Sequence, residues 1–383
     1  MRRTHAQNRH IPATRIHLDN LWITKVVQTP PLKMGLIGYG LFGQHYARSI
    51  AASSVTSLAA VAAQSAARRE AARQAHPDTD IFSDWRCITE REDIELIAVV
   101  VPNHLHYEMG AAVLRANKHL LMEKPLALQI DQCDQLLALA HESQTILAVG
   151  HELRLSPLWG RAKALIDAGE IGQPRHVLIE LARFPYRPGS TGWRHDQNRV
   201  GNWILEEPIH FFDLARWYLS TAGDPVSVFA QANSSNDAAL DMADHFSAIV
   251  TFADGSYAVV SQTLSSFGHH QSAKISGSQG TIQATWGAAD ARSDECVYDL
   301  RYGMGDRSCE VPLSGHPGEL RELADEIESV VHSIRNHTPV FCNGDDGRWS
   351  VRLCLAARES IASGLPVSLN ALPDREAPVP ASA

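Results

Sequence analysis

The glycine-rich stretch at residues 38–43 (GYGLFG) limits the possible folds of this chain more than any other feature. It follows a short apolar run at 33–39, and it opens a stretch to about residue 53 that fits a helix; a second apolar run covers 58–63. A strand, a glycine turn, a helix and a strand in this order make a βαβ unit. In such a unit Gly38 allows the tight turn, Gly40 lets the backbone approach a pyrophosphate, and Gly43 permits close contact between helix and strand. The pattern predicts a dinucleotide site with contacts from Gly38, Tyr39, Gly40, Leu41, Phe42 and Gly43.

The end of the second predicted strand bears on which dinucleotide is bound. An acidic residue at this place grips the ribose 2′-OH of NAD. This chain instead has Ala63, Gln64 and Ser65, followed by Arg68 and Arg69. Ser65 with Arg69 can accept a 2′-phosphate, and this favours NADP. NAD stays open, because both arginines can equally be solvated helix residues.

The alternation of predicted elements divides the chain in two. Apolar runs at 95–101, 119–122 and 145–149 alternate with helical stretches at 68–75, 106–117 and 130–143, as in a doubly wound parallel sheet. After residue 150 the segments 175–184, 245–252 and 256–264 alternate apolar and polar residues, which is typical of antiparallel strands with one buried face. Helices predicted near 320–335 and 347–363 fit either half. We expect an arm at 1–32, a Rossmann domain at 33–150, a second domain at 151–372 and a tail at 373–383.

Charge and cysteine content exclude several classes of protein. The formal net charge is −9, and no basic cluster follows the first three residues, so a nucleic-acid surface is not expected. None of the six cysteines forms a CxxC pair, which disfavours a zinc ribbon or a disulfide framework. No apolar run reaches the roughly 20 residues of a membrane helix, and the first thirty residues do not read as a secretory signal. The expected location is the cytoplasm, without a membrane partner.

Several further motifs carry a resemblance to a known family. Glu123-Lys124-Pro125 follows a predicted strand, and the chain also has VPNHLH at 101–106, GHELRLSP at 150–157, HFFD at 210–213 and GLPVSL at 364–369. Together they resemble the Gfo/Idh/MocA oxidoreductases, over residues 33 to about 369. The resemblance implies an α/β Rossmann N-terminal domain and an α+β C-terminal domain with a large, mostly antiparallel open sheet. It also implies assembly through that sheet into a homodimer or homotetramer, and hydride transfer between NAD or NADP and an alcohol carbon of a sugar, cyclitol or glycoside.

The resemblance also implies roles for particular residues. Oxidation of an alcohol needs a base for the hydroxyl proton and a cation or donor for the developing oxyanion. Lys124 is implied in the active site, where it can stabilise the oxyanion or take part in proton transfer, and His210 is implied as general acid/base. Asp213 is predicted to orient the histidine from the same helix face. Pro102, Asn103, His106 and Glu123 are expected beside the cofactor. Residues expected to border the substrate cleft are Arg154, Tyr186, Trp193, Arg194 and His195.

One motif departs from the family. The usual Asp-x-Gly-x-His is here Glu206-Glu207-Pro208-Ile209-His210, so Glu206 stands where an aspartate assists the histidine. The longer side chain displaces the carboxylate, which leaves open whether Glu206 or Glu207 has this role or binds substrate. The histidines of the cleft segments lie too far apart in sequence for a metal motif, and no metal is expected. Two other functions remain: an NAD-dependent glycoside hydrolase that acts by transient C3 oxidation and elimination, and a non-catalytic cofactor-binding protein, which the presence of both Lys124 and His210 disfavours.

Overall fold

A six-stranded parallel sheet forms the first part of the fold, with the strand order β3-β2-β1-β4-β5-β6. Buried Leu, Ile, Val and Ala side chains fill its central strands, as a sheet covered on both faces requires. The strand order reverses between β1 and β4, and ligands bind at such a point. Its elements are β1 (Leu32–Ile37), α1 (Leu41–Ala52), β2 (Thr56–Ala62), α2 (Ala66–Ala75), β3 (Asp80–Phe82), α3 (Arg86–Thr89), β4 (Leu96–Val99), α4 (His106–Arg115), β5 (His119–Glu123), α5 (Ile130–Glu142) and β6 (Leu147–Gly150).

A nine-stranded sheet follows, with the order β14-β13-β12-β11-β7-β10-β9-β8-β15. Among the strands that the structure describes in this sheet, β7 and β10 alone pair in parallel. The predicted fold class, a Rossmann domain followed by a large, mostly antiparallel sheet, is confirmed. The strands are β7 (Pro174–Arg183), β8 (Pro225–Asn233), β9 (His245–Phe252), β10 (Tyr257–Thr263), β11 (His269–Gly277), β12 (Thr281–Ala288), β13 (Cys296–Met304), β14 (Arg307–Glu310) and β15 (Val367–Ser368).

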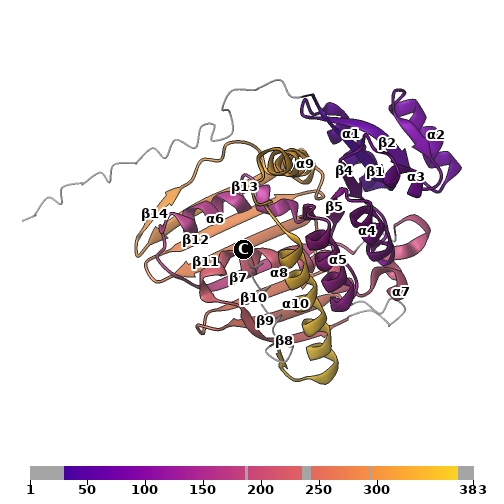
Figure 1. Cartoon of the computed structure of the whole chain (residues 1–383). Helices are drawn as coiled ribbons and strands as arrows, with labels where there is room; N and C mark the ends of the chain where they lie inside the picture. Colours follow the sequence, from indigo (N-terminus) through magenta and orange to yellow (C-terminus); the bar gives the residue numbers. More distant parts are fainter. Residues whose placement is uncertain (1–29, 186–188, 235–242, 294, 370–383) are drawn as a thin grey trace, which may run out of the picture.

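Helices cover one face of this second sheet and leave the other face open (Figure 1). The covering helices α6 (Trp159–Asp167), α8 (Pro208–Tyr218) and α10 (Gly344–Ser363) pack on alternate, inward-facing residues of the strands. Pro208 begins α8, where its missing N–H leaves no helical hydrogen bond unmade. The structure describes residues 30–185, 189–234, 243–293 and 295–369, so Tyr186, the 373–383 tail and all but the last residues of the 1–32 arm lie outside it.

The helix α9 (Glu319–Asn336) returns from the second sheet to the first domain. Its buried face, with Leu323, Ile327 and Val330, joins the hydrophobic cluster of β1 and α1. The next helix, α10, packs instead on α8, α5 and β8. One wall of the dinucleotide domain is thus built from the C-terminal part of the chain.

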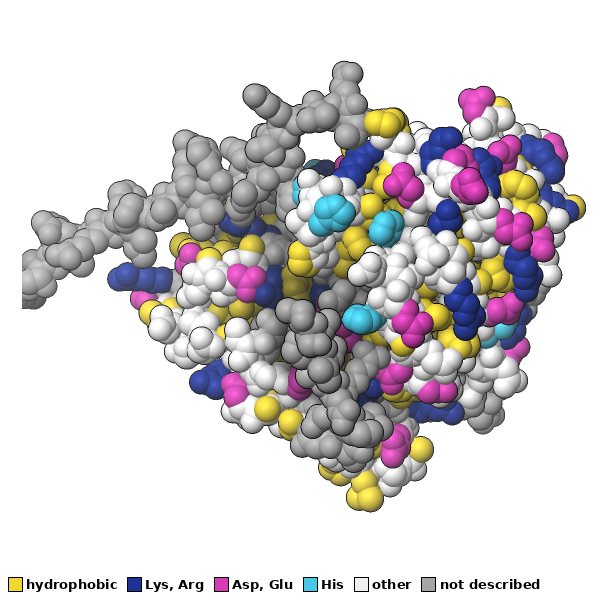
Figure 2. Space-filling view, in the orientation of Figure 1, with side chains coloured by type: hydrophobic (Ala, Val, Ile, Leu, Met, Phe, Trp, Pro, Cys, Tyr) yellow, Lys and Arg dark blue, Asp and Glu magenta, His cyan; other side chains and the backbone are white. Residues whose placement is uncertain are grey.

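Charged side chains of both signs are mixed on the face of the molecule that Figure 2 shows. Acidic and basic side chains alternate over the visible face, without a continuous basic patch among the residues drawn in colour (Figure 2). Within the described ranges, every helix is too short or too polar to cross a bilayer.

Candidate active site

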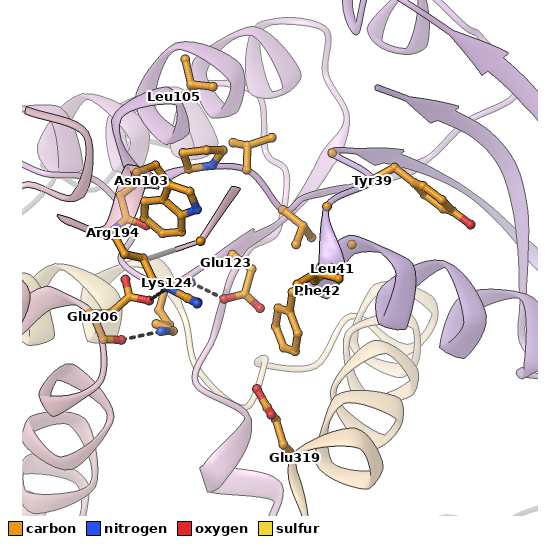
Figure 3. Close-up of a pocket in the computed structure, with 18 of the residues that line it drawn as sticks. Tyr39, Leu41, Phe42, Asn103, Leu105, Glu123, Lys124, Arg194, Glu206 and Glu319 are labelled. Carbon is orange, nitrogen blue, oxygen red and sulfur yellow. Dashed lines mark hydrogen bonds and ion pairs between the residues drawn. The ribbon is translucent and has the colours of Figure 1, made fainter. Parts of the chain in front are cut away.

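A cleft of about 1520 Å³ lies between the two sheets. The first domain lines it with the glycine loop and the residues that follow β2, β4 and β5. The second domain lines it with the end of β7, the segment 193–210, the loop after β12 and the start of α9. Figure 3 shows side chains from both domains converging on Lys124.

The glycine loop has the conformation that a dinucleotide requires. Gly38 has φ +105°, and a Cβ on it would stand 2.0 Å from the carbonyl oxygen of Val100. A Cβ on Gly43 would stand 2.2 Å from the carbonyl oxygen of Gly38. A Cβ on Gly40 would meet nothing within 4 Å, so this position opens onto the cleft. No side chain caps the first turn of α1 and no acidic residue lies in it, so its free N–H groups can bind phosphate. These residues fit a dinucleotide.

At the end of the cleft beside β2, the structure differs from the prediction in one residue. Ser65 and Arg68 line the cleft, whereas Arg69 does not. The Nη1 atom of Arg69 donates to the carbonyl oxygens of Ala63 and Gln64, at 2.9 and 2.6 Å. Arg69 therefore ties α2 to the end of β2, and Arg68 is the arginine that faces the cleft.

The 102–106 segment lies only partly in the cleft. Pro102 and Asn103 line the cleft, and the Nδ2 of Asn103 also donates to the carbonyl oxygen of Val200 at 3.1 Å. His106 is fully buried behind this loop, with its ring nitrogens 2.9 and 2.6 Å from the carbonyl oxygens of Val101 and Pro125. His106 thus joins two loops and does not contact the cleft.

Lys124, Glu206 and Arg194 form one charged group in the cleft. The Nζ of Lys124 donates to the backbone oxygen of Glu206 at 2.5 Å, and the Nε of Arg194 donates to Oε1 of Glu206 at 2.6 Å (Figure 3). Burial alone would raise the pKa of Glu206, but Arg194 and Lys124 hold this pKa below its ordinary value. Glu206 is therefore an anion, and its carboxylate binds Arg194.

Glu207 and Trp193 lie beside this group. The carboxylate of Glu207 pairs with Arg183 on β7, and its other oxygen lies 3.4 Å from Nε2 of His269. The guanidinium of Arg194 lies over the ring of Trp193, 5.2 Å from its centroid. Both glutamates and this tryptophan line the cleft.

His210 lines the cleft from the first turn of α8, but Asp213, its predicted partner, does not contact it. Its Nδ1 lies 3.6 Å from Oε2 of Glu152, and Asp213 pairs elsewhere. Burial, with Lys124 and His151 nearby, holds the pKa of His210 well below its ordinary value, so the imidazole is neutral and can accept a proton. Sequence reasoning missed Glu152. Its only signal is its position two residues after β6, at the carboxyl edge of the sheet.

Arg154, predicted to bind substrate, lies outside the lining of the cleft. Its side chain is 3% exposed, and it donates to both carboxylate oxygens of Asp213 at 2.7 Å and to Asp346 at 2.8 Å. Asp346 also pairs with Arg216 at 2.7 Å, so two guanidinium groups balance the two carboxylates, and Arg154 joins α8 to α10.

The same ion pair argues against a cation at a nearby group of potential metal ligands. Single ligand atoms of His151, Asp213 and Cys342 lie within 4.8 Å of one another. Both oxygens of Asp213 are held by Arg154, and burial raises the pKa of the Cys342 thiol well above its ordinary value. The neutral imidazole of His151 and the thiol of Cys342 remain, and beside the positive charge of Arg154 they make a poor site for a metal cation.

Buried carboxyl groups gather where α9 meets the first domain. The hydroxyl of Tyr46 lies 2.7 Å from Oε1 of Glu123 and 2.8 Å from Oε1 of Glu326. A hydroxyl donates only one hydrogen, so one of the two carboxyl groups must itself be protonated. Burial raises the pKa of both, and it raises the pKa of Glu322, one helical turn before Glu326, to about 7.

The Glu322→Gln substitution is expected to stabilise the protein more at pH 8 than at pH 5. The pKa of Glu322 is about 7 in the folded protein, against an ordinary value of 4.5. Between these values the unfolded chain has already released the proton, so the wild type loses free energy of unfolding as pH rises from 4.5 through 7. The shift corresponds to a loss of about 3 kcal/mol in the free energy of unfolding of the wild type. The Glu322→Gln protein, which has no titrating group at this position, does not lose it. Urea unfolding at both pH values measures the difference; an equal effect at pH 5 and pH 8 would contradict it.

Two family models match the chain. Residues 32–151 match the model described as "Oxidoreductase family, NAD-binding Rossmann fold", and residues 159–283 match the GFO/IDH/MocA C-terminal domain. The chain belongs to the Gfo/Idh/MocA oxidoreductase family. This family is one of enzymes, and the open glycine cradle fits its NAD-binding fold.

Relatives of known name cover nearly the whole chain of this oxidoreductase. It is 27% identical to the inositol 2-dehydrogenase of Rhizobium meliloti over 88% of this chain and 99% of the relative. It is 26% identical to the UDP-N-acetylglucosamine 3-dehydrogenase of Acidithiobacillus ferrooxidans over 87% and 98%. The crystal structure of a putative myo-inositol dehydrogenase from Sinorhizobium meliloti superposes with a TM-score of 0.74 at 26% identity, over 88% of this chain and 99% of the other.

Proposed function

We propose that this oxidoreductase transfers a hydride between NAD or NADP and a secondary alcohol or ketone carbon of a sugar, cyclitol or glycoside. One observation carries the proposal: Lys124 and His210, from different domains, line the same cleft as the open glycine loop. The names of the relatives, which refer to inositol and to a UDP-sugar, support polyhydroxylated substrates.

The residues of the cleft have distinct roles in this proposal. A bound nicotinamide supplies the hydride acceptor for oxidation and the hydride donor for reduction. The ammonium of Lys124 stabilises the oxyanion that develops on the reacting carbon, and the neutral imidazole of His210 accepts the hydroxyl proton. The carboxylate of Glu206 holds Arg194 toward the substrate, which gives it a positioning role. Trp193 offers a stacking face to the C–H side of a sugar ring, while Arg194 and Glu207 bind its hydroxyl groups.

We propose NADP as the preferred cofactor, with Ser65 and Arg68 at the 2′-phosphate. Arg68→Ala is expected to raise the Kd for NADP about tenfold, because one charge-assisted contact of about 1.5 kcal/mol is lost, and to leave the Kd for NAD nearly unchanged. Titration with both cofactors measures this. Arg69→Ala is the matched control, and it should not change the ratio of the Kd for NADP to the Kd for NAD. An equal loss of NAD and NADP affinity in Arg68→Ala would mean that Arg68 does not bind the 2′-phosphate.

A substrate screen tests the proposal itself. Sugars, inositols and glycosides are incubated with the protein and with each oxidised cofactor, and the absorbance of reduced nicotinamide is followed beside release of aglycone. Net reduced cofactor with a polyol supports the dehydrogenase. Aglycone release without net reduced cofactor would identify the hydrolase that works by transient C3 oxidation. Tight cofactor binding without either reaction would favour a non-catalytic binding protein.

We propose assembly into a homodimer or homotetramer through the open face of the second sheet. Ile249 and Tyr257, on paired strands β9 and β10, are 41% and 43% exposed there. Light scattering is expected to give twice or four times the mass of the chain. A monomer at micromolar concentration would contradict this assembly.

A further inference from the structure

The catalytic histidine of the proposed function faces an unexpected carboxyl group. Nδ1 of His210 is enclosed and has no hydrogen-bond partner among the described residues. The carboxyl group that it faces is that of Glu152, with Oε2 at 3.6 Å. The other two candidates are already bound, since Glu206 accepts from Arg194 and Asp213 accepts from Arg154. Glu152 is therefore the carboxyl group placed to act on this nitrogen.

We propose that Glu152 is the positioning residue of His210 and exchanges one proton with its Nδ1, so that the two side chains together form the acid–base unit. This inference rests on the proposed function. The distance of 3.6 Å is longer than a hydrogen bond, but such catalytic contacts are often long without substrate and shorten in the complex. The surroundings hold both groups in place: the ring of His151 meets that of His210 edge-on, with centroids 5.4 Å apart, and the 3₁₀ turn that begins at Glu152 packs on α9.

The position of one proton sets the direction in which the pair can act. When Glu152 is protonated, it donates to Nδ1, so the histidine carries its hydrogen on Nε2 and can donate to a ketone oxygen. When Glu152 is ionised, it accepts from Nδ1–H, and Nε2 is then free to accept a proton from an alcohol. During oxidation the hydride leaves the carbinol carbon for the cofactor, the hydroxyl proton moves to Nε2, and the Nδ1 proton moves to the Glu152 carboxylate. The pair gains one proton, and reduction returns it.

The neighbouring charges decide which group holds the exchanged proton. Glu152 is surrounded by Glu123 at the end of β5 and by Glu319, Glu322 and Glu326 on α9; burial, followed by these carboxylates, raises its pKa well above the ordinary value. His210 faces Lys124 and His151, which act with burial to lower its pKa. The extra proton therefore goes to the carboxyl group before it goes to the imidazole. The pair titrates as a unit, with a pKa that belongs to neither residue alone.

Nitrogen NMR of the imidazole tests the pair in the full chain without any substrate. The signal of His210 is identified by its loss in His210→Asn. In the wild type between pH 5 and 9, we expect the neutral ring to change from the Nε2–H to the Nδ1–H tautomer as pH rises. Glu152→Gln should show one tautomer throughout, and Glu152→Asp should keep the change at a different pH. The matched control is Glu322→Gln, which removes another buried carboxyl and should keep the change of tautomer, shifted only to a lower pH. A wild-type ring that stays in one tautomer, or a Glu152→Gln ring that still changes, would overturn the inference.

The pH dependence of turnover separates this inference from the proposed function. For the wild type, kcat/KM for oxidation should rise about tenfold per pH unit below the pKa of the pair, and kcat/KM for reduction should fall about tenfold per unit above it. In Glu152→Gln both slopes should disappear, and kcat should fall about tenfold or more. Wild-type slopes in this variant, with Lys124→Ala inactive, would overturn the inference and leave the function standing. If the wild type turns over no polyol, the proposed function fails, and the NMR experiment still decides the inference.

Discussion

Lys124→Ala and His210→Ala are each expected to lower kcat by at least a factor of about 100, the usual scale for a lost acid–base or oxyanion-stabilising group. Lys124 supplies the cation at the reacting oxygen, and His210 supplies the neutral imidazole. Neither side chain lies at the glycine loop, so the Kd for the oxidised cofactor should stay within about threefold. Steady-state kinetics and a cofactor titration on the same preparations measure both quantities.

Lys124→Arg is the matched variant for this prediction. It keeps a positive charge but cannot place a compact ammonium at the same point, so we expect a kcat between those of the wild type and Lys124→Ala. Loss of cofactor binding in Lys124→Ala or His210→Ala, with the fold intact, would contradict the proposed separation of cofactor and catalytic residues.

Gly40→Val is expected to raise the Kd for either cofactor about 100-fold, or about 3 kcal/mol, while the fold is kept. A Cβ at this position meets no protein atom within 4 Å, and the backbone of Gly40 has φ −70°, which valine adopts without strain. The valine side chain would therefore occupy the space through which a pyrophosphate reaches the N–H groups of α1.

Gly40→Ala provides the graded control, because its single methyl should give an intermediate Kd. Calorimetric titration with NAD and NADP measures all three proteins, and circular dichroism checks that each is folded. Wild-type affinity in Gly40→Val would mean that the dinucleotide binds elsewhere.

The fold could be predicted where the local sequence pattern determines what a strand or helix packs against. The glycine turn and the buried β-branched runs indicate a parallel sheet because no other arrangement buries them so fully. β13 was not predicted, since Leu300 is its only buried residue and the strand shows little alternation. The packing of α9 was also open, because an apolar stripe with Leu323 and Ile327 fits the core of either domain.

The site was predicted less completely, and the errors have one physical origin. Lys124 and His210 lie in distinctive motifs, and both line the cleft. Arg154 and Asp213 are charged like the residues of the cleft, but they pair with each other across 59 residues of sequence, and no local spacing reveals such a pair. Glu152 was missed for the same reason, since its contact with His210 joins two segments that are far apart in the sequence.

Transfer of deuterium from substrate to cofactor tests the central claim most directly. A polyol found by the screen is prepared with deuterium on the reacting carbinol carbon and incubated with the oxidised cofactor, and the reduced cofactor is analysed by mass spectrometry. The proposed mechanism predicts one deuterium atom on the nicotinamide ring for each cofactor molecule that the wild type reduces. It also predicts that Lys124→Ala and His210→Ala form deuterated cofactor far more slowly than the wild type. Reduced cofactor without deuterium, or equal rates in all three proteins, would contradict direct hydride transfer at this cleft.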